Sequence, residues 1–232
     1  MGIGHYGVSF ALKASDKNIS LWLLFLAAQF VDILWLIFVL LGIERVEIVP
    51  GVTAANPFDF VFYPFTHSLV GSCLWAGAVY VVFRFIPAQP GSRQSHVALV
   101  MGAAVLSHFF LDLIVHRPDL PLGIGDSYKI GFGLWNYVLA AYVLEGLILL
   151  GGLWIYLQST KGTTLLGKYG MSIFAVCLLV ANLSVYREDA LNFFMPLPLT
   201  PEIFAGFTLG YHFLFVGIAF WLDQKRSYSY SK

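Results

Sequence analysis

Long apolar runs broken by short polar loops are the main pattern along the chain. Six runs reach or approach the roughly 20 helical residues needed to cross a hydrocarbon core about 30 Å thick. This pattern predicts an all-α fold, a polytopic transmembrane helical bundle in which residues 1–232 form a single integral membrane domain. The expected spans are residues 21–41, 66–86, 97–115, 132–157, 169–186 and 201–222.

Another apolar stretch, residues 5–14, is too short to cross a bilayer. It starts with His5 and carries Lys13 near its end. As a helix, the stretch would put His5 about 12 Å deeper in the membrane than Lys13. We therefore expect a short N-terminal half-helix whose basic end lies at the cytoplasmic surface.

The composition agrees with a membrane protein. Hydrophobic residues make up 59% of the chain and charged residues 11%, and the mean hydropathy is +0.78. Such values exclude an ordinary soluble domain. The net charge of zero argues against a nucleic-acid partner.

Basic residues in the loops predict an orientation. One side of the expected bundle holds Lys13, Lys17, Arg84, Arg93, Lys161, Lys168, Lys225, Arg226 and Lys232. The other side holds fewer basic residues and most of the acidic ones: Arg45, Arg117, Lys129, Arg187, Glu44, Glu47, Asp59, Asp119, Asp126, Glu188, Asp189 and Glu202. The positive-inside rule then predicts that both termini lie in the cytoplasm.

Ionisable residues inside the apolar runs suggest a function. His108 and Asp112 are four residues apart, and His116 follows four residues later. On a helix these positions lie on roughly one face, with a drift of about 40° per step. Ionisable groups in hydrocarbon are costly and are usually retained for a task. The alternative is a set of hydrogen bonds that ties helices together.

Asp32, His67 and His5 are further candidates. Asp32 is an isolated carboxylate in a run without a basic residue, and a buried carboxylate must be protonated, paired or bound to metal. His67 opens the second run, where an interfacial, hydrated histidine is the alternative. His5 lies near the terminus, where a mobile residue without function is the alternative.

Imidazole and carboxylate groups without a thiolate suit Zn, Mn, Fe or a mixed two-metal site. We expect one or two divalent ions, in the first place Zn. Such a site would activate water and clamp a phosphoryl or ester oxygen. His116 or Glu145 would act as general base or acid, and Arg117 could meet a substrate phosphate. The alternatives are an interfacial His116 and a protonated, structural Glu145.

Several short motifs resemble the bacterial membrane-bound metal-dependent hydrolase family, the YdjM-like proteins. They are Gly4-His5, Asp32 after the first run, Thr66-His67-Ser68, Ser107-His108-x-x-x-Asp112 and Leu120-Pro121-Leu122, so the resemblance covers residues 4–122. It implies metal-dependent hydrolysis with the ligand set His5, Asp32, His67, His108 and Asp112. The sequence departs from the family where Tyr63-Pro64-Phe65 replaces a frequent His-Arg-Gly, and where Phe30-Val31-Asp32 replaces a Pro-Asp-x-Asp cluster.

These observations predict an integral protein of the cell inner membrane that hydrolyses a lipid-like phosphoester or ester. A transporter that relays a metal ion or protons is one rival, which broken helices and Glu145 on a two-sided path would favour. A scaffold without catalysis is the other. His5 comes from the cytoplasmic side, whereas His67 and His116 lie near the outer face. Only a site at about mid-depth would include all three.

Overall fold

The computed structural model describes residues 1–125, 128–186 and 199–228, which are mostly helical. Asp126, Arg187, Glu188, Asp189 and Lys232, which entered the orientation argument, lie outside the described residues. The helices are α1 (Gly4–Lys13), α2 (Leu21–Ala28), α3 (Phe30–Leu40), α4 (Pro64–His67), α5 (Leu69–Phe85), α6 (Gln94–Val115), η1 (Leu134–Asn136), α7 (Val138–Ser159), α8 (Leu165–Tyr186) and α10 (Pro201–Asp223).

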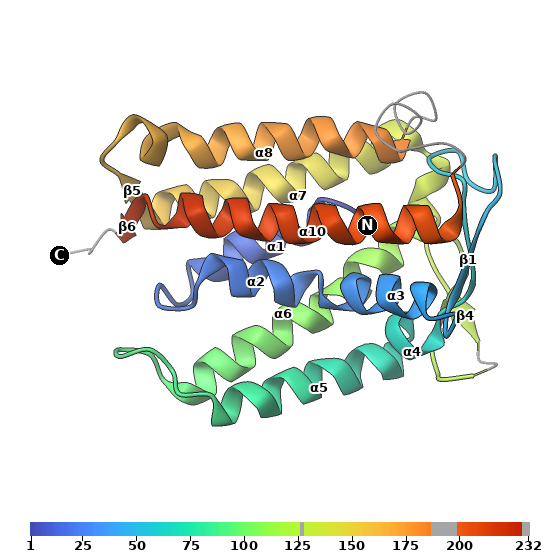
Figure 1. Ribbon diagram of the computed structural model, residues 1–232, viewed down its shortest axis with the longest axis horizontal. Coiled ribbons are helices and arrows are strands. Elements are labelled where there is room, and N and C mark those ends of the chain that lie inside the picture. Colours follow the sequence, from blue (N-terminus) through green and yellow to red (C-terminus); the bar gives the residue numbers. More distant parts are fainter. Residues whose placement is uncertain (126–127, 187–198, 229–232) are drawn as a thin grey trace.

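The long helices run roughly along the long axis of the molecule, and the loops gather at its two ends (Figure 1). In this view α7, α8 and α10 form one side of the bundle, α5 and α6 form the other, and α2 and α3 lie between them. Short antiparallel strand pairs lie at the ends: β1 (Arg45–Ile48) with β2 (Phe58–Phe62), β3 (Leu120–Pro121) with β4 (Lys129–Ile130), and β5 (Thr160–Gly162) with β6 (Arg226–Tyr228).

Among the described residues, four helices are long and apolar enough to cross a membrane: α6, α7, α8 and α10. The pair α2 and α3 passes the same test as one unit, but it is bent by 55° at Gln29. Helix α5 is apolar and has 17 residues. The structure therefore has four or five helices that qualify as spans by length and composition.

Two of the expected spans become helical later than expected, whereas α6 and α8 begin earlier, at Gln94 and Leu165. The run expected from residue 66 is interrupted at Ser68, whose Oγ accepts a hydrogen bond from Gly71 N at 2.9 Å and caps α5. The run expected from residue 132 becomes helical only at Val138. Gly133, with φ of 73°, first turns the chain into η1.

Helix α1 lies inside the bundle, in contact with α7, α2 and α6. It approaches α7 closely because Gly7 faces Gly152: a Cβ on Gly152 would overlap the Gly7 carbonyl oxygen. At the far end of α1, Lys13 Nζ lies 3.4 Å from Asp223 Oδ2 of α10. This anchor fixes how far α1 reaches into the molecule.

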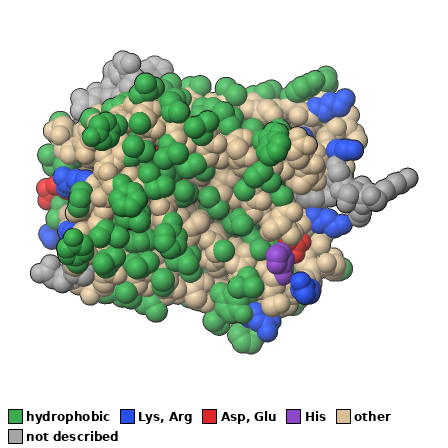
Figure 2. Space-filling view, turned by 180° about the vertical axis from the view of Figure 1, so that it is seen from behind, with side chains coloured by type: hydrophobic (Ala, Val, Ile, Leu, Met, Phe, Trp, Pro, Cys, Tyr) green, Lys and Arg blue, Asp and Glu red, His purple; other side chains and the backbone are tan. Residues whose placement is uncertain are grey.

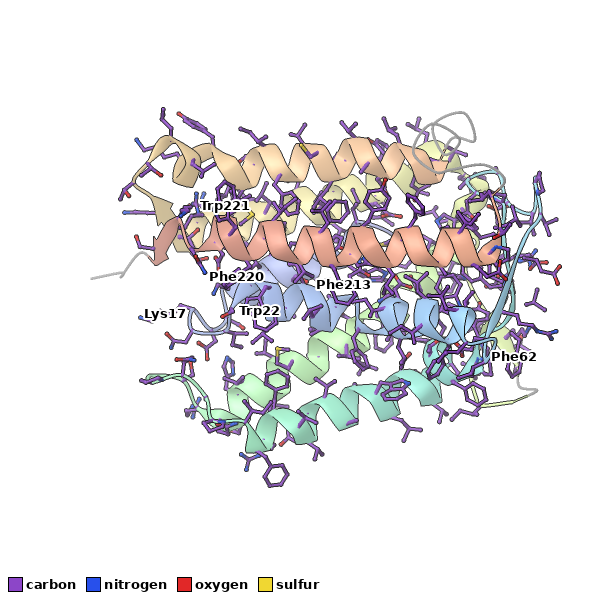
Figure 3. All side chains as sticks on the ribbon, in the orientation of Figure 1. Lys17, Trp22, Phe62, Phe213, Phe220 and Trp221 are labelled. Carbon is purple, nitrogen blue, oxygen red and sulfur yellow. The ribbon has the colours of Figure 1, made fainter. Side chains whose placement is uncertain are left out.

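The surface is apolar in its middle and charged at its ends. On the face in Figure 2, hydrophobic side chains cover the middle, and the Lys and Arg side chains lie towards the two ends. Aromatic side chains gather at the end that carries Lys17, where Trp22 packs edge-on against Phe220 with ring centroids 6.4 Å apart (Figure 3). An apolar middle flanked by aromatic and basic side chains is typical of proteins that span a membrane.

Candidate metal centre

Five side chains expected to hold a metal meet in the interior of the bundle. They come from α1, α3, α4 and α6. Two groups each bring three ligand atoms within 4.8 Å of one another: His5, Asp32 and His108 in the first, and His67, His108 and Asp112 in the second. Because His108 belongs to both groups, the five residues form one cluster that could hold a metal ion. We call it the His/Asp cluster.

The two carboxylates of the His/Asp cluster stand between the imidazoles. Asp112 Oδ2 lies 3.1 Å from His108 Nε2 and 3.7 Å from His67 Nε2. Asp112 Oδ1 lies 3.2 Å from His5 Nε2 and also contacts the Met1 amino group. Asp32 Oδ1 lies 3.2 Å from His67 Nε2 and 3.4 Å from His108 Nε2. Ligand atoms about 2.0–2.2 Å from a tetrahedral Zn ion would be roughly 3.3–3.6 Å apart, so the residues fit such an ion.

A backbone carbonyl fixes the protonation of His108. Its Nδ1 lies 2.9 Å from the Ala28 carbonyl oxygen, which can only accept, so Nδ1 carries a proton, and in the neutral ring Nε2 has the lone pair. The bend between α2 and α3 at Gln29 lies directly beside this bond. Among the residues described, the contacts of His108 Nε2 with the two carboxylates lack hydrogen-bond geometry. A buried lone pair that faces two carboxylates is the arrangement of a metal ligand.

A chain of hydrogen bonds leads outward from His67. Its Nδ1 lies 2.8 Å from Thr66 Oγ1, and this hydroxyl donates to Glu44 Oε2 at 2.6 Å. Because the hydroxyl proton goes to Glu44, His67 Nδ1 is the donor and its Nε2 faces Asp32. Burial raises the pKa of Glu44 to about 7, although its hydrogen bonds with Thr66 and Phe65 oppose the shift.

Asp119 orients His116 in the same way. His116 Nδ1 lies 3.0 Å from Asp119 Oδ1, which also accepts the Tyr63 hydroxyl proton at 3.0 Å. Burial opposes ionisation of Asp119, but the hydrogen bonds from His116, Tyr63 and Arg117 lower its pKa. The ionised carboxylate accepts a hydrogen bond from the Nδ1–H group of His116. The other ring nitrogen, Nε2, then faces Asp112 Oδ2 at 3.9 Å.

Two residues expected to take part in catalysis lie outside the cavity lining. Glu145 Oε2 accepts the backbone N–H of Gly2 at 2.9 Å and of Gly4 at 3.3 Å, and Tyr186 donates to its Oε1 at 2.6 Å. Glu145 therefore holds the beginning of α1. Arg117 donates to Asp119 Oδ2 at 3.1 Å and pairs with Asp59. Arg117 therefore positions Asp119 and Asp59 beside the His/Asp cluster.

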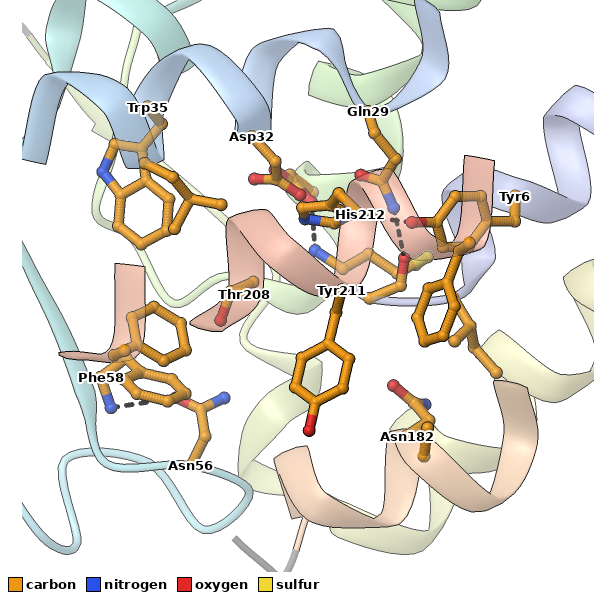
Figure 4. Close-up of a pocket in the computed structure, with 18 of the residues that line it drawn as sticks. Tyr6, Gln29, Asp32, Trp35, Asn56, Phe58, Asn182, Thr208, Tyr211 and His212 are labelled. Atoms are coloured by element: carbon orange, nitrogen blue, oxygen red, sulfur yellow. Dashed lines mark hydrogen bonds and ion pairs between the residues drawn. The ribbon is translucent and has the colours of Figure 1, made fainter. Parts of the chain in front are cut away.

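A cavity of about 400 Å³ adjoins the His/Asp cluster. Asp32, His67, Asp112 and His116 form its polar wall. Figure 4 shows Tyr6, Gln29 and His212 towards one end of the cavity, and Trp35, Asn56 and Phe58 towards the other. Cys177 of α8 lines the cavity and is also exposed. Cys177 therefore lies between the cavity and the outer surface of α8, and α10 contributes further lining residues: Phe204, Thr208, Tyr211, His212 and Phe215.

Sequence reasoning missed the residues that orient the histidines. Asp119 follows His116 by three positions, a spacing that could have suggested the pair. Glu44 carries no such local signal, because its partner Thr66 is 22 residues away in the sequence. The His212 side chain, which also lines the cavity, has its Nδ1 2.8 Å from the Tyr6 hydroxyl.

No protein-family model, curated protein or solved structure matches this chain. The chemistry of the site must therefore be argued from its own residues. The His/Asp cluster combines inward lone pairs of imidazole with two carboxylates, and a largely apolar cavity lies next to it. This arrangement can bind a divalent cation and bring an apolar molecule against it.

Proposed function

We propose that the protein is an integral membrane metal-dependent hydrolase that acts on a lipid-like phosphoester or ester. The observation that carries this proposal is which nitrogen of each imidazole ring faces the His/Asp cluster. The Nδ1–H groups of His108 and His67 donate hydrogen bonds to acceptors outside the His/Asp cluster. Their Nε2 atoms face Asp32 and Asp112. The cluster would hold one or two divalent ions, Zn in the first place and otherwise Mn or Fe.

A divalent ion bound there supplies Lewis acidity that activates water and polarises an ester or phosphoryl oxygen. His116 acts as the general base. Its Nδ1–H donates a hydrogen bond to Asp119, which leaves the lone pair of Nε2 on the side of the cavity. The proton taken at Nε2 can then pass to the leaving group. Arg117 and Glu145 act indirectly in this scheme, by positioning Asp119 and α1.

The membrane arrangement completes the proposal. We infer six passes, with α2 and α3 forming one bent span, α5 forming a short one and α1 forming a half-helix that enters from the cytoplasmic side. The excess of basic residues at the end with Lys13 and Lys17 supports cytoplasmic termini in the cell inner membrane. A membrane lipid could reach the cavity sideways, beside the exposed Cys177. The short motifs around His5, His67 and His108 further support membership of the YdjM-like hydrolases.

One observation favours a second candidate, a metal-ion or proton-coupled transporter. Transporters often bind their cargo at interrupted helices, and the 55° bend of α2 and α3 lies at the His/Asp cluster. A transporter also needs access from both sides of the membrane. Flux of Zn into proteoliposomes that stops in His108→Ala, without turnover of any lipid ester, would favour transport over hydrolysis.

Metal content measured by elemental mass spectrometry tests the proposal most directly. We expect one or two ions per chain in detergent-purified protein, and at least a tenfold loss in His108→Ala and Asp112→Ala. His96→Ala is the matched control, because His96 lies near the start of α6, outside the cavity lining. Thermal unfolding would establish that all variants are folded. A wild-type protein that stays empty after addition of Zn or Mn would contradict the proposal and leave a proton relay or a scaffold.

A further inference from the structure

His5 differs from the other histidines at the His/Asp cluster in the contacts of its ring. The Nδ1 atoms of His67, His108 and His116 each lie 2.8–3.0 Å from an oxygen atom that accepts a hydrogen bond. Within the described part of the chain, the buried Nδ1 of His5 has no such partner, and His5 lies outside the cavity lining. Its other ring nitrogen, Nε2, is hydrogen-bonded to Asp112 Oδ1 at 3.2 Å.

These contacts indicate which nitrogen of His5 carries the proton. With the proton on Nδ1, a buried N–H group would lack an acceptor, and the lone pair of Nε2 would face a carboxylate oxygen. Both arrangements are unfavourable in a buried site. With the proton on Nε2, the N–H group donates a charge-assisted hydrogen bond to Asp112. The contacts therefore favour Nε2–H, and in that form Nε2 has no lone pair for a metal ion.

The stacking of His5 on His108 gives a second, independent argument. The two rings are parallel to within 3°, and their centroids are 3.8 Å apart. The lone pair of an imidazole nitrogen lies in the plane of the ring, so an ion bound by His108 lies close to that plane. Planes of stacked rings are roughly 3.5 Å apart, whereas a Zn–N bond measures about 2.0–2.1 Å. An ion in the plane of His108 is therefore too far from His5 to be shared by both.

The His67 ring has the orientation towards His108 that His5 lacks. The rings of His67 and His108 are inclined by 73°, with centroids 5.4 Å apart. Two inclined planes intersect, so one ion can lie close to both of them. Both Nε2 atoms also face the same carboxylate oxygen, Asp112 Oδ2, at 3.1 Å from His108 and 3.7 Å from His67. His67 and His108 can therefore share an ion, with Asp112 Oδ2 as a third ligand.

We propose that His5 is a positioning residue of the metal centre rather than a ligand. Its Nε2–H group donates to Asp112 Oδ1 and so directs Oδ2 of the same carboxylate towards an ion held by His67 and His108. Hydrogen bonds of this kind orient a ligating carboxylate and tune the metal affinity. This inference rests on the proposed function for the presence of the ion, but not for the reaction. It reduces the ligand set from five side chains to four: Asp32, His67, His108 and Asp112.

Substitution by glutamine separates a positioning role of His5 from a ligand role. The amide NH₂ group of glutamine can still donate to Asp112, whereas its carbonyl oxygen is a poor ligand for Zn. The measurement is the dissociation constant of Zn, from competition with a chelator in detergent-purified full-length protein. We expect this constant to rise by about 10- to 100-fold in His5→Ala but by less than about threefold in His5→Gln.

The same substitution at the other histidines of the cluster is the matched control. His67→Gln and His108→Gln each remove a ligand, so the dissociation constant should rise by more than the roughly 100-fold reached when an outer hydrogen-bond partner is lost. Thermal unfolding would establish that the variants are folded. Co²⁺ in place of Zn gives a second readout, because its visible absorption depends on the atoms bound to it. The Co²⁺ spectrum should be the same in wild-type protein and His5→Gln.

Three results would overturn the positioning role and leave the metal centre standing. Equal losses of Zn affinity in His5→Gln and His5→Ala, or a changed Co²⁺ spectrum in His5→Gln, would make His5 a ligand. Two ions per wild-type chain but one in His5→Gln would mean that His5 holds a second ion. Wild-type affinity in His5→Ala would show that its hydrogen bond is dispensable. Wild-type protein that binds no ion would overturn both the metal centre and the role of His5, whereas absence of lipid hydrolysis would contradict the proposed function alone.

Discussion

The position of the proton on each imidazole ring distinguishes a metal site from a network of structural hydrogen bonds. If Nε2 of His67 and His108 carried the protons, those nitrogens would donate to Asp32 and Asp112, and the cluster would only tie helices together. The observed acceptors on the Nδ1 side, Ala28 O and Thr66 Oγ1, assign the protons to Nδ1, so each ring in its neutral form has its lone pair on Nε2. Lone pairs would then oppose carboxylates at 3.1–3.7 Å. A bound cation relieves this repulsion.

Asp119→Asn should separate catalysis from metal binding. An asparagine can turn its NH₂ group towards His116 Nδ1, which favours the tautomer with the proton on Nε2 and removes the base. We expect turnover of a lipid ester to fall by about 10- to 100-fold with unchanged metal content. Steady-state kinetics and elemental analysis of the same preparation would measure both.

The control for this prediction is Asp59→Asn. Asp59 pairs with Arg117 rather than with His116, so its loss should change turnover by less than about threefold. Similar losses in the two variants would mean that the loop as a whole, rather than the proton on His116, limits activity. Loss of metal in Asp119→Asn would make Asp119 a support of the cluster instead.

At the scale of elements, α1 decides whether the cluster is complete. It brings His5 to His108, with the two rings stacked at 3.8 Å. Two anchors hold it lengthwise: Lys13 with Asp223 at one end and Glu145 with the backbone of Gly4 at the other. A helix of ten residues has little stability of its own. Its position therefore depends on these anchors and on its packing against α7.

Gly152→Ala tests that dependence. The added methyl group would overlap the Gly7 carbonyl oxygen and push α1 away from α7. We expect a loss of about 1–3 kcal/mol in stability from overpacking, and at least a tenfold loss of bound metal as His5 shifts. Gly151→Ala is the neighbouring control, because a Cβ there meets nothing within 4 Å. Thermal unfolding and metal analysis would compare them, and equal behaviour of the two variants would contradict a role for this close approach.

The apolar runs and the ligand candidates could be read from the sequence. A helix occurs in each of the six runs, and the spacing of His108 and Asp112 brings both side chains to one cluster. The candidates Asp32 and His67 followed from the cost of isolated polar groups in apolar runs. The structure brings them within 3.2 Å of each other. Whether the cluster binds metal stays a prediction.

Other features depend on contacts between distant residues and left no local signal. The bend at Gln29 occurs without proline or glycine, beside the hydrogen bond between His108 and Ala28, which are 80 residues apart. Glu145 was a catalytic candidate by its isolation in an apolar run. Its observed partners include the backbone N–H groups of Gly2 and Gly4, which no side-chain pattern could reveal.

At the scale of the whole molecule, the cavity lies next to an apolar part of the surface. The helices α8 and α10, which contribute to its lining, carry exposed side chains of Val176, Val180, Phe213 and Leu214. If these side chains face lipid, a hydrophobic ligand can pass from the bilayer into the cavity without crossing water. Its polar group would then meet Asp32, His67 and Asp112 in the interior. Access from the side of the protein, rather than from its ends, suits a hydrolase of membrane lipids.

The two cysteines allow this lateral route to be tested. Both are exposed, but Cys177 lines the cavity and Cys73 lies on α5, outside the lining. We expect labelling with the bulky, apolar pyrenyl maleimide to weaken dioleoylglycerol binding by at least tenfold in Cys73→Ser, which keeps Cys177. Labelled Cys177→Ser should bind as before, with stoichiometric modification verified by mass spectrometry.

Bound lipid should also slow the labelling of Cys177, because a chain that leaves the cavity there covers the thiol. Undiminished binding after complete labelling of Cys177 would place the entrance elsewhere, and access from the ends of the bundle would then favour transport.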